Sequence, residues 1–499
     1  MEMTYYPFFV YNNIGRTYNA KIVPGPVKKD LRVFFAEGIL SNPPVPWEAR
    51  FDNGYPRVFW DEDYKEYRCY YSNFARDEAS SRYSLKERIG RDYDFHDKTK
   101  YPNPRIHSLL MARSKDGISW ERPSLGAVEF NGSKDNNIVM AGWGGKVNVF
   151  RDAHEKDPAK RYKMIGKNHP PNWVTVSFSP DGIHFCDPIP VQWIGDGDHT
   201  PMADTNNYAF WDETTNCYAL ITRTWESQIF RLSNRCESDD FIHWTRPREI
   251  YRSDGMDDQL YAMPVFQRAG VYIGLGSIFH VGDMGSADFD KVDLELLYSL
   301  DCWHFIPVAA GQPLIKRGKG EYGSGAPDSG TIYASPPVRI DGKDYIYYIG
   351  GNGQHTNYRE GSLLRVEVDL DKLAGYTPRD AGEAVVSTCD TRITGSEIRF
   401  KADIYEGGII ESCIAYPPPS QFQGPIGFGR AVIPEQGFDY KDSKIEKQSD
   451  GSYRVVYAGG TPDVFKDKDV RIYFRFVKTT LYGIGGDISP VRRIGLWDY

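Results

Sequence analysis

The sequence of 499 residues lacks the features that bind nucleic acids or cross membranes. It contains no block of Lys or Arg, and its formal net charge is −8, so it offers no basic stripe to nucleic-acid phosphates. No run of residues approaches the ~18 apolar positions of a membrane-spanning helix. We therefore expect a soluble protein with neither a nucleic-acid nor a membrane partner.

Cysteine pairs and an export leader are also missing. None of the seven cysteines stands in a Cys-x-x-Cys pair, and Cys69 and Cys217 lie in or beside predicted strands. They are expected to be buried free thiols, which fits a reducing compartment. The N-terminal residues have neither the basic start nor the apolar core of a signal peptide. A cytoplasmic protein is predicted, although a chain trimmed of an export signal would look the same.

What the sequence does contain is a repeat. Aromatic residues make up 14%, and Gly (48) and Pro (32) are frequent, which favours short strands and turns. One pattern recurs with its serines 65, 59 and 61 residues apart. The copies are Ser114-Lys-Asp116-Gly-Ile-Ser-Trp120, Ser179-Pro-Asp181-Gly-Ile-His-Phe185, Ser238-Asp-Asp240-Phe-Ile-His-Trp244 and Ser299-Leu-Asp301-Cys-Trp-His-Phe305. A period of about 60 with several short strands in each unit is typical of a β-propeller.

A pair of strands joined by a tight polar turn precedes each copy, and a fifth pair follows the last. The five hairpins span residues 58–71, 149–165, 209–221, 265–274 and 338–348. After residue 385 longer strands alternate with period two, which favours a β-sandwich. The predicted fold is all-β, a five-bladed β-propeller followed by a C-terminal β-sandwich. Its divisions are an N-terminal lead-in packed on the propeller (1–45), the propeller (46–382) and the sandwich (383–499).

The Ser-x-Asp copies are interpreted as structural turns. In such a turn the Asp accepts backbone N–H bonds, the Gly takes a positive φ and the last aromatic packs between blades. Catalysis does not need one residue per blade. His184, His243 and His304 share one repeat position and receive the same interpretation.

Propeller ligands bind at the axis, so the segment before each hairpin is where acids are sought. The acids found there are Asp52, Asp204, Asp257, Asp258 and Asp328, with Lys146 and Asn148 in the second blade instead. Carboxylates converging on one funnel are what glycosidic cleavage requires. Trp143, Trp173, Trp193 and Trp225 offer flat surfaces for sugar rings. The predicted substrate-binding residues are Asn53, Lys146, His199, Arg223, Tyr261, His280, Asp328 and His355.

At this point the chain resembles a known group. Five blades and a sandwich, with Asp52-Asn53-Gly54 before the first hairpin, look like the fructofuranosidase-type glycoside hydrolases of family 32 and the wider superfamily that includes family 43. In family 32 the first blade carries Asn-Asp-Pro-Asn-Gly, whose Asp is the nucleophile. The family's second-blade acid would fall near Lys146, where no acid stands. Its third-blade acid/base is a Glu followed by Cys, and Cys236-Glu237 resembles this pair, but Glu237 is rejected because it belongs to the outer Ser-x-Asp strand. The resemblance implies a divergent glycosidase acting on a furanoside such as a fructoside or an arabinoside.

The mechanism predicted at this stage uses three aspartates. Asp52 acts as nucleophile or base, Asp204 stabilises the oxocarbenium-like transition state, and Asp258 donates the proton, with Asp328 in reserve. The donor must be neutral, so its pKa has to be raised by burial or by a carboxylate such as Asp257. No cofactor and no metal are expected, because the His residues are dispersed.

Two alternatives remain open. A phosphorylase resembling family 130 would use one acid and a basic cluster such as Lys146 and Arg223 to bind phosphate. An inactive propeller would bind sugar without cleaving it. A homo-oligomer can form through exposed sheet edges.

Overall fold

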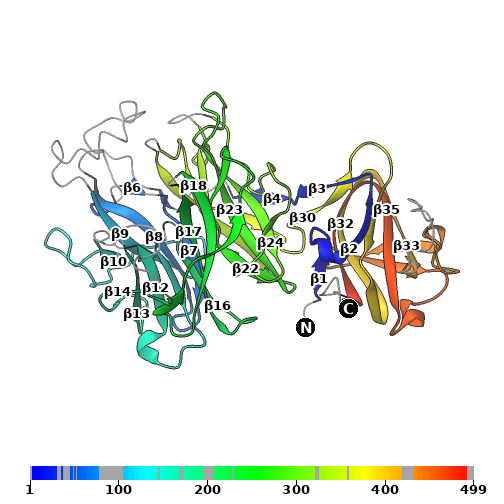
Figure 1. Cartoon of the computed structure of the whole chain (residues 1–499), viewed down its shortest axis with the longest axis horizontal. Helices are drawn as coiled ribbons and strands as arrows, with labels where there is room; N and C mark the ends of the chain where they lie inside the picture. Colours follow the sequence, from blue (N-terminus) through cyan, green and yellow to red (C-terminus); the bar gives the residue numbers. More distant parts are fainter. Residues whose placement is uncertain are drawn as a thin grey trace.

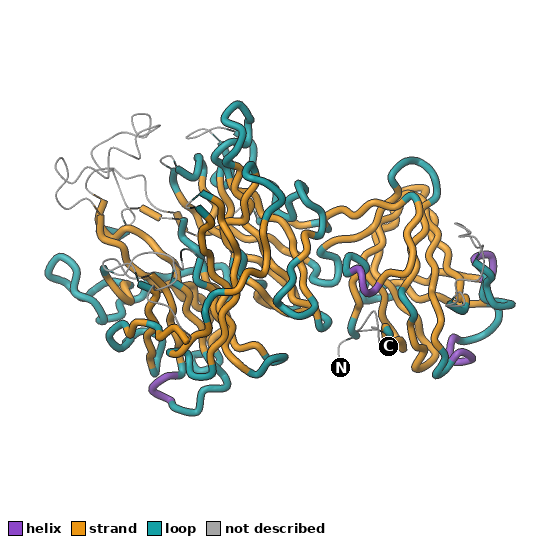
Figure 2. The backbone as a smooth tube through the Cα atoms, viewed as in Figure 1, coloured by secondary structure: helices purple, strands orange, loops and turns teal. Residues whose placement is uncertain are grey.

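The structure is a computed structural model of the chain. It describes residues 3–30, 35–36, 45–48, 50–51, 53–77, 105–142, 147–167, 173–194, 204, 206–227, 229–320, 325–356, 359–417 and 432–491. The fold is all-β, 56% strand and 3% helix, which confirms the predicted class. Strands run through both lobes of the molecule (Figure 2). The described 3-10 helices are η1 (Tyr11–Asn13), η3 (Pro158–Lys160), η4 (Tyr440–Asp442) and η5 (Pro462–Phe465).

All five predicted hairpins are present in the larger lobe (Figure 1). Four of them turn through a residue with positive φ, such as Lys65, Asn216 or Gly342, which reverses the chain between two extended segments, whereas β11 and β12 are joined by the longer segment 152–161. The hairpins are β7 (Arg57–Asp61) with β8 (Glu66–Asp77), β11 (Asn148–Arg151) with β12 (Tyr162–Lys167), β16 (Tyr208–Asp212) with β17 (Cys217–Glu226), β22 (Val265–Arg268) with β23 (Val271–His280), and β27 (Val338–Ile340) with β28 (Lys343–Gly351).

Each hairpin is extended by further antiparallel strands. The third strands are β9 (Arg105–Ser114), β13 (Val174–Ser179), β18 (Phe230–Ser238), β24 (Val292–Ser299) and β29 (Gly361–Val368). The fourth strands are β10 (Ile138–Ala141), β14 (Ile189–Pro190), β20 (Arg248–Arg252), β25 (Ile306–Pro307) and, from the N-terminal segment, β4 (Val27–Lys29). Short strands that complete these sheets are β5 (Phe35–Ala36), β6 (Arg50–Phe51), β21 (Asp258–Ala262) and β26 (Thr331–Ala334), while β15 (Gln192–Ile194) pairs in parallel with β19 (His243–Thr245).

The Ser-x-Asp copies form the turns that end the third strands, as predicted. One carboxylate oxygen of each Asp accepts the backbone N–H groups two and three residues later, at 2.7–3.0 Å. The residue after each Asp has a positive φ, whether it is glycine or not. His184, His243 and His304 each bond the Asp of their own turn through Nδ1. Their structural role is confirmed.

Neighbouring hairpins are joined by buried tyrosine–aspartate bonds. Tyr162 of β12 donates its hydroxyl to Asp61 of β7 at 2.8 Å. The contact repeats one hairpin further along the chain twice, from Tyr218 to Asp152 at 2.6 Å and from Tyr272 to Asp212 at 2.5 Å. Each sheet is thereby fixed against the next, and equivalent ends of the hairpins are held side by side.

The smaller lobe is one nine-stranded sheet. Its strands are β1 (Tyr5–Pro7), β2 (Ile14–Tyr18), β3 (Ala20–Pro24), β30 (Ala374–Pro378), β31 (Ala384–Thr388), β32 (Thr391–Ala415), β33 (Ser443–Lys447), β34 (Tyr453–Tyr457) and β35 (Asp469–Pro490). The first and last strands, β1 and β35, pair in this lobe (Figure 1). Its core contains Phe400 and Phe474, which pack with ring centres 5.0 Å apart.

The N-terminal lead-in is divided between the two lobes. Strands β1, β2 and β3 pair with β35, β31 and β30 of the smaller lobe, and only β4 and β5 pair with β29 of the larger one. This corrects the expectation that residues 1–45 pack as a whole on the propeller. Strand β30 also begins before the boundary expected at residue 383. Strand pairing explains both departures from the expected boundaries, because the open edges of the sheet in the smaller lobe take strands from either end of the chain.

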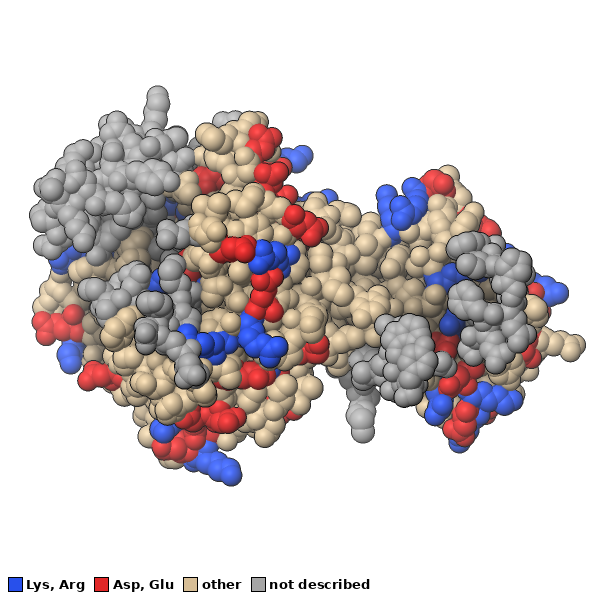
Figure 3. Space-filling view, in the orientation of Figure 1, with Lys and Arg blue, Asp and Glu red and all other residues tan. Residues whose placement is uncertain are grey.

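The described surface carries charges of both signs, and the two cysteines predicted to be free thiols are buried. Acidic and basic side chains are interspersed over the described part of the face in Figure 3. Cys69 and Cys217 are free and buried, as predicted. No helix in the described ranges is long and apolar enough to span a membrane.

Candidate functional site

Five of the predicted site residues come together around Tyr261 in β21. The Asn53 amide lies 3.5 Å from the Tyr261 hydroxyl. The Arg223 guanidinium stacks 4.3 Å from the centre of the Tyr261 ring and donates to its backbone carbonyl at 3.2 Å. The His355 ring packs edge-on, 4.6 Å away. Since Arg223 also binds Asp204, we call Asn53, Asp204, Arg223, Tyr261 and His355 the Tyr261 cluster.

The hairpin topology explains why these residues meet. Asn53 and Asp204 precede the first strands β7 and β16, Arg223 is near the end of the second strand β17, and His355 follows the second strand β28. In an antiparallel hairpin the start of the first strand and the end of the second lie at the same edge. Packing hairpins side by side therefore gathers these positions at one end of the larger lobe. Asn53 has a φ of +58°, so a tight turn sets the direction of its side chain.

Asp204 is the carboxylate of this cluster. It accepts from Arg223 Nη2 at 2.5 Å and from Trp225 Nε1 at 3.0 Å, and Lys167 Nζ lies 3.7 Å from its other oxygen. An ion pair supported by a second N–H donor is the setting of an ionised carboxylate. Its side chain remains 17% exposed, so a ligand can reach it. Trp225, predicted to stack on a sugar ring, instead orients Asp204.

Arg223 is buried but keeps its charge. Burial lowers the pKa of its guanidinium, and the neighbouring Tyr261 and Asp204 more than reverse this, so the pKa is raised overall. A permanent cation on Asp204 has two effects: it fixes the position of the carboxylate, and it cancels the cost of holding that charge in a partly buried site.

Asp258 and His280 lie in a second group, outside the Tyr261 cluster. His280 bridges two carboxylates, Asp258 at 2.6 Å and Asp293 at 2.9 Å, and Arg317 bonds Asp293 at 2.7 Å. Burial lowers the pKa of His280, and its bonds to the two carboxylates outweigh it, so the pKa is raised. The Asp258 side chain is 63% exposed. The predicted proton donor thus lacks the burial that the role requires.

Asp328, the predicted reserve acid, is a structural carboxylate. Its side chain is 5% exposed and forms an ion pair with Lys29 of β4. Tyr348 donates to the same carboxylate at 2.9 Å, and the backbone of Gly318 donates at 3.2 Å. With these partners Asp328 anchors the N-terminal strand.

Three of the predicted site residues, Asp52, Lys146 and His199, and also Trp143, lie outside the described residues. Trp173 is exposed and Trp193 is half-buried. Neither contacts the Tyr261 cluster in any interaction recorded for the described residues.

Sequence reasoning missed several members of the site. Arg359 donates to the side-chain oxygen of Asn53 and to the backbone carbonyl of His355, and Tyr333 bonds His355 Nδ1 at 2.8 Å. Arg231 of β18 and Phe279 of β23 also face the cluster. The signal was available for Arg359, which follows the same second strand as His355. It was not available for Arg231, whose third-strand position was assigned to the outer part of the sheet.

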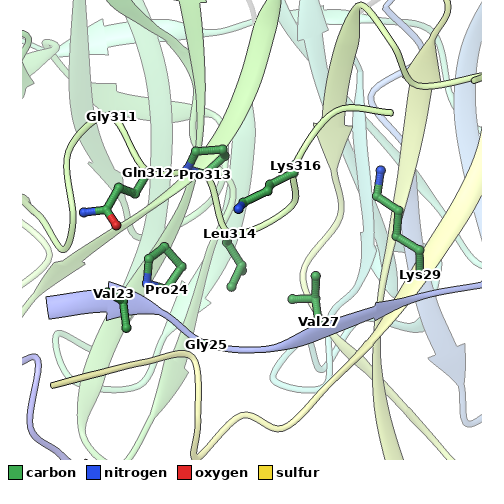
Figure 4. A pocket seen from close by; sticks show the side chains of 10 residues that line it. All are labelled: Val23, Pro24, Gly25, Val27, Lys29, Gly311, Gln312, Pro313, Leu314 and Lys316. Atoms are coloured by element: carbon green, nitrogen blue, oxygen red, sulfur yellow. The ribbon is translucent and has the colours of Figure 1, made fainter. Parts of the chain in front are cut away.

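No metal centre is found in the described ranges, and the cavity beside the N-terminal strand has no acidic lining. They contain no group of three His, Cys, Asp or Glu side chains arranged to hold a metal. Figure 4 shows a cavity of about 630 Å³ between residues 23–29 and the loop 311–316. None of the described residues that line it carries a carboxyl group. It therefore offers no acid for catalysis.

Comparisons with known proteins show likeness in structure only. No family model and no curated protein matches the chain. Among solved structures, a glycoside hydrolase matches with 14% identity over 70% of this chain and 93% of its own (TM-score 0.45). An N-acetylgalactosamine deacetylase from F. plautii, in complex with blood group B trisaccharide, matches with 13% identity over 70% and 96% (TM-score 0.43). A thermostable family-43 glycoside hydrolase matches with 14% identity over 66% and 94% (TM-score 0.43). At these TM-scores the likeness leaves the activity to be argued from the side chains.

Proposed function

We propose that this protein is a glycoside hydrolase built as a five-bladed propeller with a C-terminal β-sandwich. The observation that carries the proposal is the Tyr261 cluster, where an accessible carboxylate is fixed by an arginine among aromatic rings. Five hairpins of equal topology, the first four of them joined by repeated tyrosine–aspartate bonds, support the propeller. The strand β4, which completes the last sheet from the N-terminal side, supports a closed ring. A family 32 or family 43 ancestry remains part of the proposal.

The mechanism follows from the chemistry of Asp204. Glycosidic cleavage passes through an oxocarbenium-like transition state and uses two carboxyl groups. Asp204, ionised beside Arg223, stabilises the positive charge that develops on the sugar ring. Asp52, in the segment directly before Asn53, is proposed as the nucleophile or base, the leaving oxygen takes its proton from solvent water, and a second water completes the hydrolysis. We do not retain Asp258 as proton donor, because its exposed carboxylate is bound to His280.

The aromatic walls of the cluster suit a sugar ring. Tyr261, Phe279 and His355 pack against one another with ring centres 4.6–5.6 Å apart, beside the polar side chains of the cluster. Asn53 and Arg359, which bond each other, add an amide and a guanidinium, groups of the kind that hydrogen-bond hydroxyl groups. A furanoside such as a fructoside or an arabinoside is the proposed substrate class.

The test is the release of reducing sugar by wild-type protein from a panel of fructosides, arabinosides, galactosides and mannosides, with and without phosphate. Phosphate-independent release that Asp52→Asn abolishes is expected. Release that requires phosphate would make the protein a phosphorylase. Sugar binding without release from any member of the panel would make it a binding propeller, and the hydrolase proposal would fail.

A further inference from the structure

A second arginine beside the Tyr261 cluster, Arg231, carries a charge that no carboxylate of the described residues matches in an ion pair. The Arg231 guanidinium lies 4.5 Å from the centre of the Trp225 ring, 5.0 Å from that of Phe279 and 5.4 Å from that of Tyr261. Strands β17 and β18 place it there, because Arg231 pairs directly with Trp225 in their register. The side chain is half-buried, so part of it still faces solvent.

The hydrogen bonds of Arg231 do not compensate its charge. Its Nη1 donates to the neutral side-chain amide of Gln259 at 3.0 Å, and its Nε is buried with no hydrogen-bond partner in the part of the chain that the structure describes. Among the described residues no carboxylate forms an ion pair with it. The contrast is with Arg223, whose charge Asp204 matches at 2.5 Å.

Electrostatics agrees with this geometry. Burial, and then the nearby charge of Arg223, lower the pKa of Arg231 to about 10. The side chain is still a cation at neutral pH, held where its own solvation is poor. An anion bound at this point would balance the positive charge of Arg231 and would accept hydrogen bonds from the N–H groups of its guanidinium.

We propose that the site takes an acidic glycan, and that Arg231 binds the carboxylate of a uronic acid residue in it. This inference rests on the proposed function and adds to its substrate class: the glycan that carries the cleaved furanoside also carries a uronic acid residue, which Arg231 binds. The trigonal guanidinium matches a planar carboxylate in a bidentate pair. The stacked rings of Trp225 and Phe279 hold the guanidinium plane in place. Free phosphate shares this anionic chemistry, so the test separates the two sources.

The experiment measures affinity by calorimetry for matched ligands. The ligands are short oligosaccharides of galacturonic acid and of glucuronic acid, the same oligosaccharides after reduction of their carboxyl groups, and inorganic phosphate. Wild-type protein is expected to bind the acidic form roughly tenfold to a hundredfold more tightly than the reduced form, as charged hydrogen bonds typically give. Arg231→Gln is expected to lose that preference while keeping its affinity for the reduced form.

The control is Arg252→Gln on the neighbouring strand β20, whose arginine is exposed and paired with Glu226 and Glu249. It should keep the preference. A second measurement needs no variant: the affinity of wild-type protein for both ligands is measured at increasing salt concentration. Binding of the acidic form is expected to weaken, and binding of the reduced form is not. This measurement stands even if Arg231→Gln fails to fold.

The outcomes separate this inference from the proposed function. Equal binding of acidic and reduced glycans by wild type would overturn it, even if the protein proves to be a hydrolase. Phosphate binding that depends on Arg231, without a glycan preference, would overturn it in favour of a phosphorylase. An acidic preference that Arg231→Gln removes would support it, even in a protein without turnover.

Discussion

Asp204 and Asp258 stand before neighbouring hairpins, yet their surroundings are opposite. Asp204 is partly buried and receives N–H donors from Arg223 and Trp225. Asp258 is mostly exposed and bonds His280. Position before a hairpin is therefore not enough to make a catalytic acid. The neighbours that fix the carboxylate decide its role.

A third carboxyl group, that of Glu295 in β24, provides a pH-dependent test at the residue scale. Burial raises its pKa from 4.5 to about 7, with Asp293 adding to the effect and the backbone N–H of Gly311 opposing it. Folding then favours the neutral acid, so this contribution to stability is complete below pH 4.5 and is lost as pH rises through about 7.

We expect the melting temperature of wild-type protein to fall over that range, and Glu295→Gln to flatten the slope because glutamine does not ionise. The raised pKa of His280 contributes in the same direction and is shared by both proteins. Thermal unfolding between pH 4 and 8 measures the difference. Parallel curves for the two proteins would contradict the assignment.

Much of the site was predictable at this scale, because strand-end positions follow from the hairpin pattern. Asn53, Asp204, Arg223, Tyr261 and His355 were found in this way. The sequence did not reveal that Asp328 is paired with Lys29, 299 residues away in the chain. It also could not show which strand-end side chains turn inward, since that depends on packing between sheets.

The Ser-x-Asp turn is the unit that repeats at the scale of elements. Asp240 accepts the N–H groups of Ile242 and His243 at 2.8 Å, and the pKa of its carboxyl is lowered to about 2, burial opposing and these bonds outweighing it. Its contribution to stability is present above pH 3.8 and is lost as pH falls through about 2.

Asp240→Ala should lower the free energy of unfolding by about 1–2 kcal/mol at pH 7, as the loss of a comparable capping carboxylate does. The adjacent Asp239→Ala is the matched control, because Asp239 is exposed and forms no recorded hydrogen bond. Urea unfolding at pH 7 and pH 3 measures both. Equal losses of stability in the two variants would show that the hydrogen bonds of the Asp240 carboxylate do not stabilise the turn.

Elements were the most predictable level of this structure. Hairpins such as β7–β8 and β16–β17 form from local alternation and a turn residue of positive φ. The lead-in was less predictable, because β1–β3 pair with strands more than 350 residues away. Local sequence does not specify such pairings.

At the scale of the whole molecule, the N-terminal segment holds the two lobes together. Strand β3 belongs to the sheet of the smaller lobe, and β4, three residues later, completes the last sheet of the larger one. The Lys29–Asp328 ion pair fixes β4 in that position.

Lys29→Met should destabilise the protein by roughly 3 kcal/mol, because it leaves the buried Asp328 carboxylate without its cation. Lys28→Met, next to it and exposed, should change stability by less than about 0.5 kcal/mol. Adding Asp328→Asn to Lys29→Met should recover part of the loss. Chemical denaturation measures all three, and equal effects at Lys28 and Lys29 would argue against an anchoring role.

The Asp204 carboxylate in the Tyr261 cluster is the proposed catalytic group. The most direct test is kcat of Asp204→Asn and Asp258→Asn on the glycoside that wild-type protein cleaves fastest. We expect Asp204→Asn to lose about 10²–10⁴-fold in kcat while still binding substrate, and Asp258→Asn to stay within roughly tenfold of wild type. Turnover that survives in Asp204→Asn, or that disappears equally in Asp258→Asn, would contradict the account.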